Sequence, residues 1–529
     1  MAFQNATSTL ESKSTFYSSN LNSIFTVSFI LLLAVLLRRS KGKTISYPPG
    51  PKPIPFLGNI LDMPKEYPWI AFKKWSDKYG SDLVFASVLG KRIVVVNSYT
   101  VAQDLFTKRS AIYSSRPELP MVNDLLGWSW AFNLMPYGPA WKEQRKLFKQ
   151  EAEVADGRSH EPHALLAARR FLKHMLETPD DFTEHLRHMT ALFVVSMAYG
   201  IDIKPRGDPY VAIVERANAC FSRAGNFGSY FVDFFPALKY VPDWFPGAQF
   251  KRDAKEWSKD VLALPHVGFE LAKKGHEQGT GRECITSRVL EAIQNDEDRE
   301  HKEHVLKCML GGFYAAGADT VVNVLRTLIL AMVMNPDIQR KAQTAIEAVV
   351  DKDRLPEFVD LEPIPYLHAV IKETMRWGPV TPLGVPHATS EDDVYRGYLI
   401  PKGTTIIGNS WAILQDETLF GADTHLFKPE RFLNEDGTAL NPAIPDPDMV
   451  FGYGRRICPA QFMAYAALLV TGASLLHCYD ICKARDEDGN VIEPDCVFTD
   501  GLLSAPSPFS CDFRVRSPQL KRVIQDLEC

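Results

Sequence analysis

The sequence predicts a mainly α-helical protein with small β-sheets, preceded by an N-terminal transmembrane helix. Long stretches with apolar residues at helical spacing fill the second half of the chain. Short β-rich runs flank a glycine-containing turn, which predicts a hairpin. An apolar run lies near the N-terminus. Of the 529 residues, 46% are hydrophobic, which is ample for a large buried core.

The N-terminal apolar run predicts a membrane anchor at residues 21–37. Its sequence, LNSIFTVSFILLLAVLL, is close to the length of a tilted membrane helix. A basic cluster follows the run, whereas a cleaved signal peptide carries its charge before the run and a small-residue cleavage site after it. A signal peptide remains the alternative, because the run is short for a span. The positive-inside tendency predicts residues 1–20 as a lumenal tail, with the Asn5 sequon either glycosylated or unused.

Residues 38–59 are predicted to be a basic, proline-rich hinge, and residues 60–529 one large, mainly helical domain. The run from Tyr47 to Pro55 reads YPPGPKPIP, which favours a stiff extended spacer over helix or sheet.

Within residues 60–529, a few short strands and several long helices are expected. The runs Leu83–Leu89 and Arg92–Asn97 predict a hairpin that turns at Gly90-Lys91. A second hairpin-like stretch lies around Val394–Asn409, with its turn at Pro401–Gly403. Helical patterns cover Val305–Met334, Pro336–Val350, Leu367–Trp377 and Pro459–Cys478.

Composition excludes several function classes. The net charge of −5 and the isoelectric point of about 6.3 argue against nucleic acid as the main partner. The nine cysteines show no framework spacing, which favours a reduced, cytosol-facing compartment. We find no Walker loop, nucleophile elbow or credible dinucleotide fingerprint.

The segment FGYGRRICPA, residues 451–460, places Cys458 after a glycine-containing loop and before a helix. With Pro459 at the first helical position, the helix N-terminus is expected to lower the thiol pKa. A buried thiolate there suits a soft axial ligand of haem iron, and Arg456 can reach a haem propionate. The alternative from the residues alone is a buried structural cysteine.

Two further patterns lie on predicted helices. Glu373 and Arg376 are three residues apart and share a helical face, and Arg431 follows later. Taken alone, the first two form an ordinary surface pair; buried with Arg431, they would form a shared ion cluster. Asp319 and Thr320 stand inside an otherwise apolar helix, where an acid and an alcohol either mark a kink or leave room for bound oxygen or water.

In this order, the motifs resemble those of the cytochrome P450 family. Phe451-x-x-Gly454-x-Arg456-x-Cys458 resembles its haem-binding signature, with Ala460 where glycine is usual. Glu373-x-x-Arg376 with Arg431 resembles the family's scaffold motif, and residues 316–320 resemble its oxygen-activation motif. The resemblance covers essentially the whole chain after the anchor. It implies the cytochrome P450 fold, a haem-containing catalytic domain at residues 60–529, and haem b held by Cys458.

The resemblance also implies residue roles. Thr320 would hydrogen-bond the bound oxygen, and Asp319 would help to relay protons. Trp141 and Arg145 resemble the pair that binds haem propionates. His387 occupies a position where the family often places a propionate-binding residue; on its own, a lone histidine is a weak signal. Lys142, Lys146 and Lys149 form a second face of the Trp141 helix, which is either a solvated surface or a docking site for a reductase.

By the same resemblance, the chain is a monooxygenase of the endoplasmic reticulum membrane, with its catalytic domain in the cytosol. It would insert one oxygen atom from O2 into an apolar small molecule, with electrons from a separate NADPH-dependent reductase. The sequence looks most like fungal secondary-metabolite members, which makes a terpenoid the first expectation and an indole or polyketide the next. An oxygen-independent isomerase or dehydratase and a non-catalytic haem-binding protein remain the alternatives.

Overall fold

The computed structural model describes residues 45–152, 158–225 and 228–528. The expected lumenal tail, the anchor at 21–37, Asn5 and the first part of the hinge lie outside these residues. Residues 45–59 contain turns and isolated bridges but no helix, as expected for a proline-rich segment. A small unit that includes residues 45–47 and 394–399 separates from the remainder of the chain.

The main sheet has four strands in the order β1-β2-β6-β3. Strands β1 (Leu83–Val88) and β2 (Lys91–Val96) form the predicted antiparallel hairpin. Its two loop residues are Leu89 and Gly90, with φ of 48° and 86°, so the turn lies one residue earlier than predicted. Two residues with positive φ match the twist of the flanking strands. Strand β6 (Thr405–Gly408) runs parallel to β2, and β3 (His387–Ala388) pairs antiparallel with β6.

The second predicted hairpin turns at a different place. Strands β4 (Asp393–Tyr395) and β5 (Tyr398–Ile400) pair across Arg396 and Gly397, whose φ values are 49° and 81°. The turn at Pro401–Gly403 leads instead into β6. The hairpin turns at Arg396-Gly397 and not at Pro401–Gly403, because Gly397 adopts a left-handed conformation without strain.

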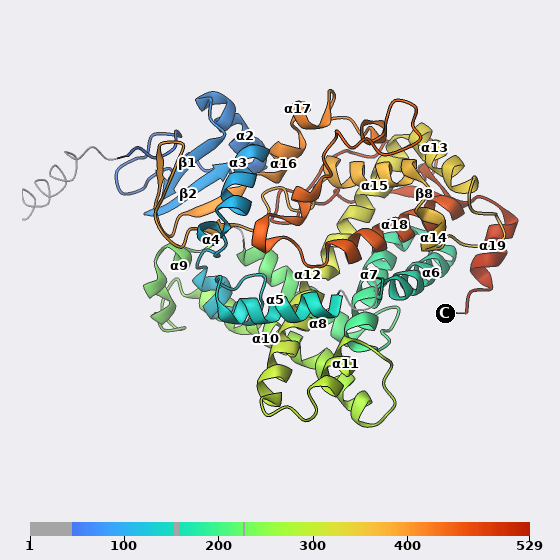
Figure 1. The fold of residues 1–529 in the computed structure, drawn as a ribbon, viewed down its shortest axis with the longest axis horizontal. Coiled ribbons are helices and arrows are strands. Elements are labelled where there is room, and N and C mark those ends of the chain that lie inside the picture. Colours follow the sequence, from blue (N-terminus) through green and yellow to red (C-terminus); the bar gives the residue numbers. More distant parts are fainter. Residues whose placement is uncertain (1–44, 153–157, 226–227, 529) are drawn as a thin grey trace, which may run out of the picture. The chain divides into compact units, whose positions relative to one another are not determined.

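Most other elements are helices (Figure 1). They are α2 (Pro68–Tyr79), α3 (Tyr99–Ala102), α4 (Ser110–Tyr113), α5 (Pro139–Ala152), α6 (Glu161–Glu177), α7 (Phe182–Tyr199), α8 (Pro209–Ala224), α9 (Phe231–Phe234), α10 (Gln249–Glu277), α11 (Ile285–Ala292), α12 (Arg299–Met334), α13 (Pro336–Glu347), α14 (Phe358–Leu361), α15 (Pro365–Trp377), α16 (Ser410–Leu414), α17 (Glu417–Phe420), α18 (Gln461–Cys478) and α19 (Pro518–Gln525). A strand pair, β7 (Tyr479–Lys483) and β8 (Cys511–Val515), follows α18. This confirms the mainly helical fold class with small sheets.

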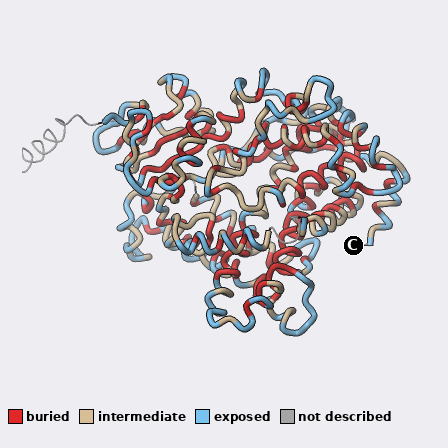
Figure 2. The backbone as a smooth tube through the Cα atoms, viewed as in Figure 1, coloured by how far each residue is buried: buried red, intermediate tan, exposed pale blue. Residues whose placement is uncertain are grey.

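Helix α12 is the central structural element around which the core is packed. It contacts α5, α7, α8, α10 and α18, and buried residues run along α7, α12 and α18 (Figure 2). Asn335 ends α12 and Pro336 starts α13, as predicted. Within the described part of the chain, α12 and α18 are long and apolar enough to span a membrane by length and composition, and 56% and 78% of their apolar windows are buried in the protein.

A buried ion cluster fixes α15 to the segment after α17. Arg376 donates from Nε and Nη2 to the two Glu373 carboxylate oxygens at 2.7 and 2.8 Å, and Arg431 Nε donates to Oε1 at 3.1 Å. Glu373 and Arg376 are fully buried. The backbone N–H of Lys428 also donates to Glu373, at 2.8 Å. The predicted cluster is therefore present as a buried structural lock and not as a surface pair.

Candidate functional site

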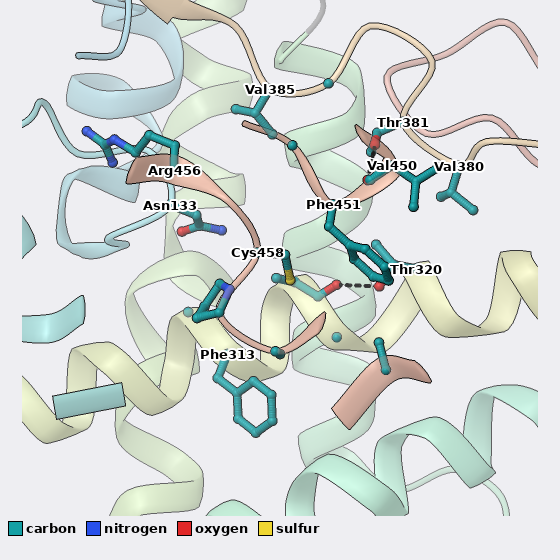
Figure 3. Close-up of a pocket in the computed structure, with 18 of the residues that line it drawn as sticks. Asn133, Phe313, Thr320, Val380, Thr381, Val385, Val450, Phe451, Arg456 and Cys458 are labelled. Carbon is teal, nitrogen blue, oxygen red and sulfur yellow. Dashed lines mark hydrogen bonds between the residues drawn. The ribbon is translucent and has the colours of Figure 1, made fainter. Parts of the chain in front are cut away.

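A large cavity, of about 270 Å³, lies between α12 and the loop that precedes α18 (Figure 3). Its walls come from α5, α7, α12, the segment after α15 and the loop 450–460. Most of the lining is apolar, including Phe313, Val321, Val380 and Phe451. In the segment after α15, Val380, Thr381 and Leu383 also line this cavity.

Cys458 lies in the cavity wall on a sharply folded loop. Its backbone N–H donates to the carbonyl oxygen of Phe451 at 2.7 Å, which closes the loop. Gly454 has φ of 52°, and a Cβ there would lie 1.9 Å from the carbonyl oxygen of Phe106. Only glycine fits this position, so the glycine of the motif is a requirement of backbone packing.

The expected helix start and thiol pKa need correction. Helix α18 begins at Gln461 with Ala460 as its N-cap, and Pro459 lies in the preceding turn. In the structure without haem, burial raises the pKa of the Cys458 thiol, while the backbone N–H of Ala460 and the charge of Arg145 oppose that rise. Burial outweighs the helix terminus because a thiolate loses its solvation in an apolar wall.

Four basic side chains line one part of the cavity: Arg116, Arg145, His387 and Arg456. Burial lowers the pKa of Arg456 to about 10, and the charge of Arg145 adds to this effect. Burial and the charge of Arg456 lower the pKa of Arg116, and burial and Arg116 lower that of His387. The groups are therefore close enough to repel one another, and no acidic residue among the described ones lines the cavity beside them.

Several of these basic groups are already anchored to the backbone. Arg456 donates to the carbonyl oxygens of Ser114, Phe132 and Met135 at 2.7, 3.2 and 2.6 Å. His387 Nδ1 lies 2.6 Å from the carbonyl oxygen of Tyr113. In contrast, the guanidinium group of Arg145 has no hydrogen-bond partner among the described residues.

Arg116 also lines the cavity, although no sequence motif pointed to it. Its Nε donates to Asn133 and its Nη1 to Val385 and Pro386, all at backbone carbonyl oxygens. Its Nη2 has no partner among the described residues. Arg116 stands outside every motif quoted above, and a buried cation can be identified only once the fold places it beside other cations.

Trp141 belongs to the same part of the site. It is buried on α5, lines the cavity, and lies under the Arg456 guanidinium, whose carbon is 4.5 Å from the ring centroid. Buried cations without acids are costly, so this region calls for an anionic ligand. A flat, apolar group that carries carboxylates, as haem b does, fits both the apolar walls and the basic part of the cavity.

The two expected oxygen-activation residues face different cavities. Thr320 lines the large cavity, and its hydroxyl donates to the carbonyl oxygen of Ala316 at 3.1 Å. Asp319 lines a separate small cavity, and its Oδ2 accepts a hydrogen bond from Asn218 Nδ2 at 2.9 Å. Consecutive helical residues point about 100° apart, so the structure does not bring these two side chains into one pocket.

Comparison with known proteins identifies the family. The cytochrome P450 family model matches residues 48–513. A cytochrome P450 monooxygenase of Armillaria gallica is 40% identical over 95% of this chain and 99% of its own length. A second one, from Rhodocybe pseudopiperita, is 39% identical over 93% and 94%. Tryptamine 4-monooxygenase of Psilocybe cyanescens is 38% identical over 90% and 94%. The chain therefore belongs to the cytochrome P450 family, the monooxygenases that hold haem iron through a cysteine thiolate.

Proposed function

We propose that this protein hydroxylates a neutral, apolar small molecule of secondary metabolism, a terpenoid first and an indole or polyketide next. The observation that carries the proposal is one apolar cavity lined by both the Cys458 thiol and the Thr320 side chain. Haem supplies the oxygen-transfer chemistry when bound, and the protein supplies the ligand, the proton donors and a dry, shaped pocket.

In this proposal, Cys458 ligates the iron, and the basic cluster of Arg116, Arg145, His387 and Arg456 neutralises the propionates. Arg145 and Nη2 of Arg116 carry most of this role, because Arg456 already donates to three carbonyl oxygens. Trp141 supports the cluster through its contact with Arg456.

We assign Thr320 and Asp319 to proton delivery. The Thr320 hydroxyl is held toward the large cavity and can exchange its bond to Ala316 for one to a ligand or a water. Asp319 faces the neighbouring small cavity, and we assign it the role of the acid that resupplies this proton. An oxygen-independent isomerase or dehydratase needs no such pair, so the position of Thr320 favours the monooxygenase reaction.

The charges around the cavity support a neutral substrate. No Asp or Glu occurs among the described residues that line it, while four basic groups do. A protonated amine would have no carboxylate partner among these residues, and burying an unpaired ammonium group is costly. The relative from Psilocybe cyanescens is named for tryptamine. For the present chain, the lining favours an uncharged terpenoid over a cationic indole-amine.

Electrons come from a separate reductase, as in other cytochrome P450 monooxygenases. Lys142, Lys146 and Lys149 are exposed on α5, opposite the face that carries Trp141. We propose this lysine face as the contact for an acidic reductase domain.

We further propose that the protein is a single-pass protein of the endoplasmic reticulum membrane, with its catalytic domain on the cytosolic side. Exposed aromatic residues near α9 support contact with the membrane surface: Phe231, Phe235, Tyr240, Trp244 and Phe245. Phe234 packs against the same small hydrophobic cluster as Ile60 and Met63, next to exposed Leu61. The part of the domain that follows the hinge therefore adjoins this aromatic surface.

The test combines membranes that contain the protein with an NADPH-dependent reductase, isotopically labelled O2 and two probes, a sesquiterpene hydrocarbon mixture and tryptamine. We expect a terpene product that contains one labelled oxygen atom and little or no product from tryptamine. A rearranged or dehydrated product without label would favour the isomerase or dehydratase. Hydroxylated tryptamine with no terpene product would overturn the substrate assignment.

A further inference from the structure

Helix α12 borders a second, much smaller cavity on its other side. This cavity has a volume of about 10 Å³, which is close to the space that one water molecule needs. Arg187 on α7, Glu215 on α8, and Tyr314 and Asp319 on α12 contribute its polar lining. The Tyr314 hydroxyl is buried and has no hydrogen-bond partner among the described residues. A buried polar atom of this kind is usually satisfied by an ordered water.

Asn218 on α8 ties that helix to α12 beside this cavity. Its Nδ2 donates to the Ala315 carbonyl oxygen and to Asp319 Oδ2, both at 2.9 Å. Because the side-chain amide has two N–H groups, it can make both bonds at once. Asp319 is therefore held in a fixed orientation that borders the small cavity.

Glu215, which also lines the cavity, is an exposed residue. Arg187 is exposed too, and it donates to Glu184 at 2.7 Å. An exposed acid and Asp319 therefore line the same small space, which fits one water. Such an arrangement of acid, water and acid is suited to proton transfer.

We propose that Glu215 takes up protons from solvent and passes them through a water in the small cavity to Asp319, which Asn218 positions as the receiver. This inference rests on the proposed role of Asp319 in proton delivery and extends that role to α8. Glu215 is a proton-transfer residue, and Asn218 is a positioning residue.

The proton balance is simple. A solvent hydronium protonates the Glu215 carboxylate, Glu215 gives that proton to the cavity water, and the water gives one of its own protons to Asp319. Neither residue is oxidised or reduced, and the electrons of monooxygenation come from the reductase. Each transferred proton is one that the reaction consumes as it forms water from the second oxygen atom.

The electrostatics of Glu215 agree with this role. Partial burial of the carboxyl raises its pKa, and the neighbouring acids Glu184 on α7 and Asp319 on α12 raise it further, against the lowering effect of Arg187 and Arg216. A carboxyl with a raised pKa stays protonated in a larger share of molecules near neutral pH, which makes it a better proton donor.

The test compares Glu215→Gln and Asn218→Leu with Asp319→Asn and with Glu256→Gln as the matched control. Glu256 is exposed on α10, away from the small cavity, and pairs with Lys259 at 2.5 Å. Each haem-loaded variant is mixed with saturating reductase and NADPH without added substrate. NADPH consumption and its solvent deuterium isotope effect are then measured across neutral pH. A second readout, on protein without NADPH, is a pH titration of the infrared C=O band of protonated carboxyls.

We expect Glu215→Gln and Asn218→Leu to slow NADPH consumption by about tenfold, less than the ~10²–10⁴ typical of a direct acid–base group, because bulk water can partly substitute. The deficit should grow as pH rises, the isotope effect should increase, and Glu256→Gln should match the parent. The infrared titration should lose one carboxyl band in Glu215→Gln. Because Glu215 is exposed, this variant tests the inference even if Asn218→Leu fails to fold.

Two outcomes would overturn the inference, and they are distinguishable. If Asp319→Asn is slow while Glu215→Gln and Asn218→Leu match the parent in rate, pH profile and isotope effect, protons reach Asp319 by another route and the proposed function stands. If Asp319→Asn also matches the parent, the proposed role of Asp319 fails, and the inference fails with it.

Discussion

Two clusters of buried charge differ in one respect: whether they contain an acid. Around Glu373, two arginines and a backbone N–H surround a carboxylate, and the charges are paired within the protein. In the cavity wall, three arginines that include Arg456, together with His387, have no acid beside them among the described residues of the lining. The first cluster is complete without a ligand and stabilises the fold. The second needs an anionic group from outside the chain and therefore marks the binding site.

The largest expected effect is on the complete cluster. Glu373→Gln leaves Arg376 and Arg431 buried without their carboxylate, so we expect a loss of about 3–5 kcal/mol in the free energy of unfolding. Chemical denaturation of the purified protein measures it. The control Glu357→Gln removes the exposed pair with Arg169 and should cost about 0–1 kcal/mol. Equal effects of the two substitutions would refute the structural lock.

Loss of one charge from the incomplete cluster, the one without an acid, should weaken ligand binding and leave the stability of the protein intact. Arg145→Gln removes a cation that has no partner, so the haem-free protein should keep its stability or gain slightly. Haem binding should weaken by about 1.5–3 kcal/mol, or roughly tenfold to a hundredfold, because a charge-assisted bond to a propionate is lost. Absorbance titration of haem-free protein with haem measures this affinity. Arg455→Gln, an exposed neighbour that contacts Tyr137, is the control. Unchanged haem affinity in Arg145→Gln would contradict the assignment.

The same cluster predicts a pH effect. Burial and Arg116 lower the pKa of His387 in the haem-free protein, and nearby propionates would raise it again. Haem binding should then take up a proton between the two pKa values, so haem affinity should fall as pH rises through that window. In the haem-free protein, the lowered pKa means that stability should fall as pH drops below the ordinary histidine value of about 6.5. Both trends should be weaker in His387→Asn; identical profiles would remove His387 from the site.

Thr320→Ala should have the smallest effect on either cluster, because Thr320 belongs to neither. We expect the stability and haem affinity of the parent but less product per NADPH consumed, since the hydroxyl that faces the cavity is lost. The measurement is the ratio of product to NADPH in the reconstituted reaction, with Thr327→Ala as a control elsewhere on α12, where the hydroxyl donates to Asn323. Unchanged coupling would contradict the assigned role of Thr320.

Sequence spacing predicted the parts of the molecule that depend on local geometry. The three-residue spacing of Glu373 and Arg376 on a helix and the glycine loop before Cys458 both agree with the structure. Contacts between distant segments were harder to predict. Arg116 joins the site only because the segments around residues 116, 133 and 385 meet in the fold.

The separation of Asp319 from Thr320 could have been anticipated in part. Helical geometry alone turns neighbouring side chains by about 100°, so one of the pair had to leave the large cavity. Asn218, which holds Asp319, lies about a hundred residues earlier and carries no motif of its own. The predicted lowering of the Cys458 pKa was wrong in direction. The prediction considered the helix terminus but not the burial of the thiol, which raises the pKa more.

The most direct test of the central claim, that the incomplete cluster and Cys458 together hold haem through a thiolate, is the reduced, carbon-monoxide-bound difference spectrum. Membranes with the parent protein are compared with Cys458→Ser and with Cys496→Ser, a control at an exposed free cysteine. We predict a Soret band at the red-shifted thiolate position in the parent and in Cys496→Ser, and its loss in Cys458→Ser. A thiolate band that persists in Cys458→Ser, or its absence from folded, haem-loaded parent protein, would contradict the account.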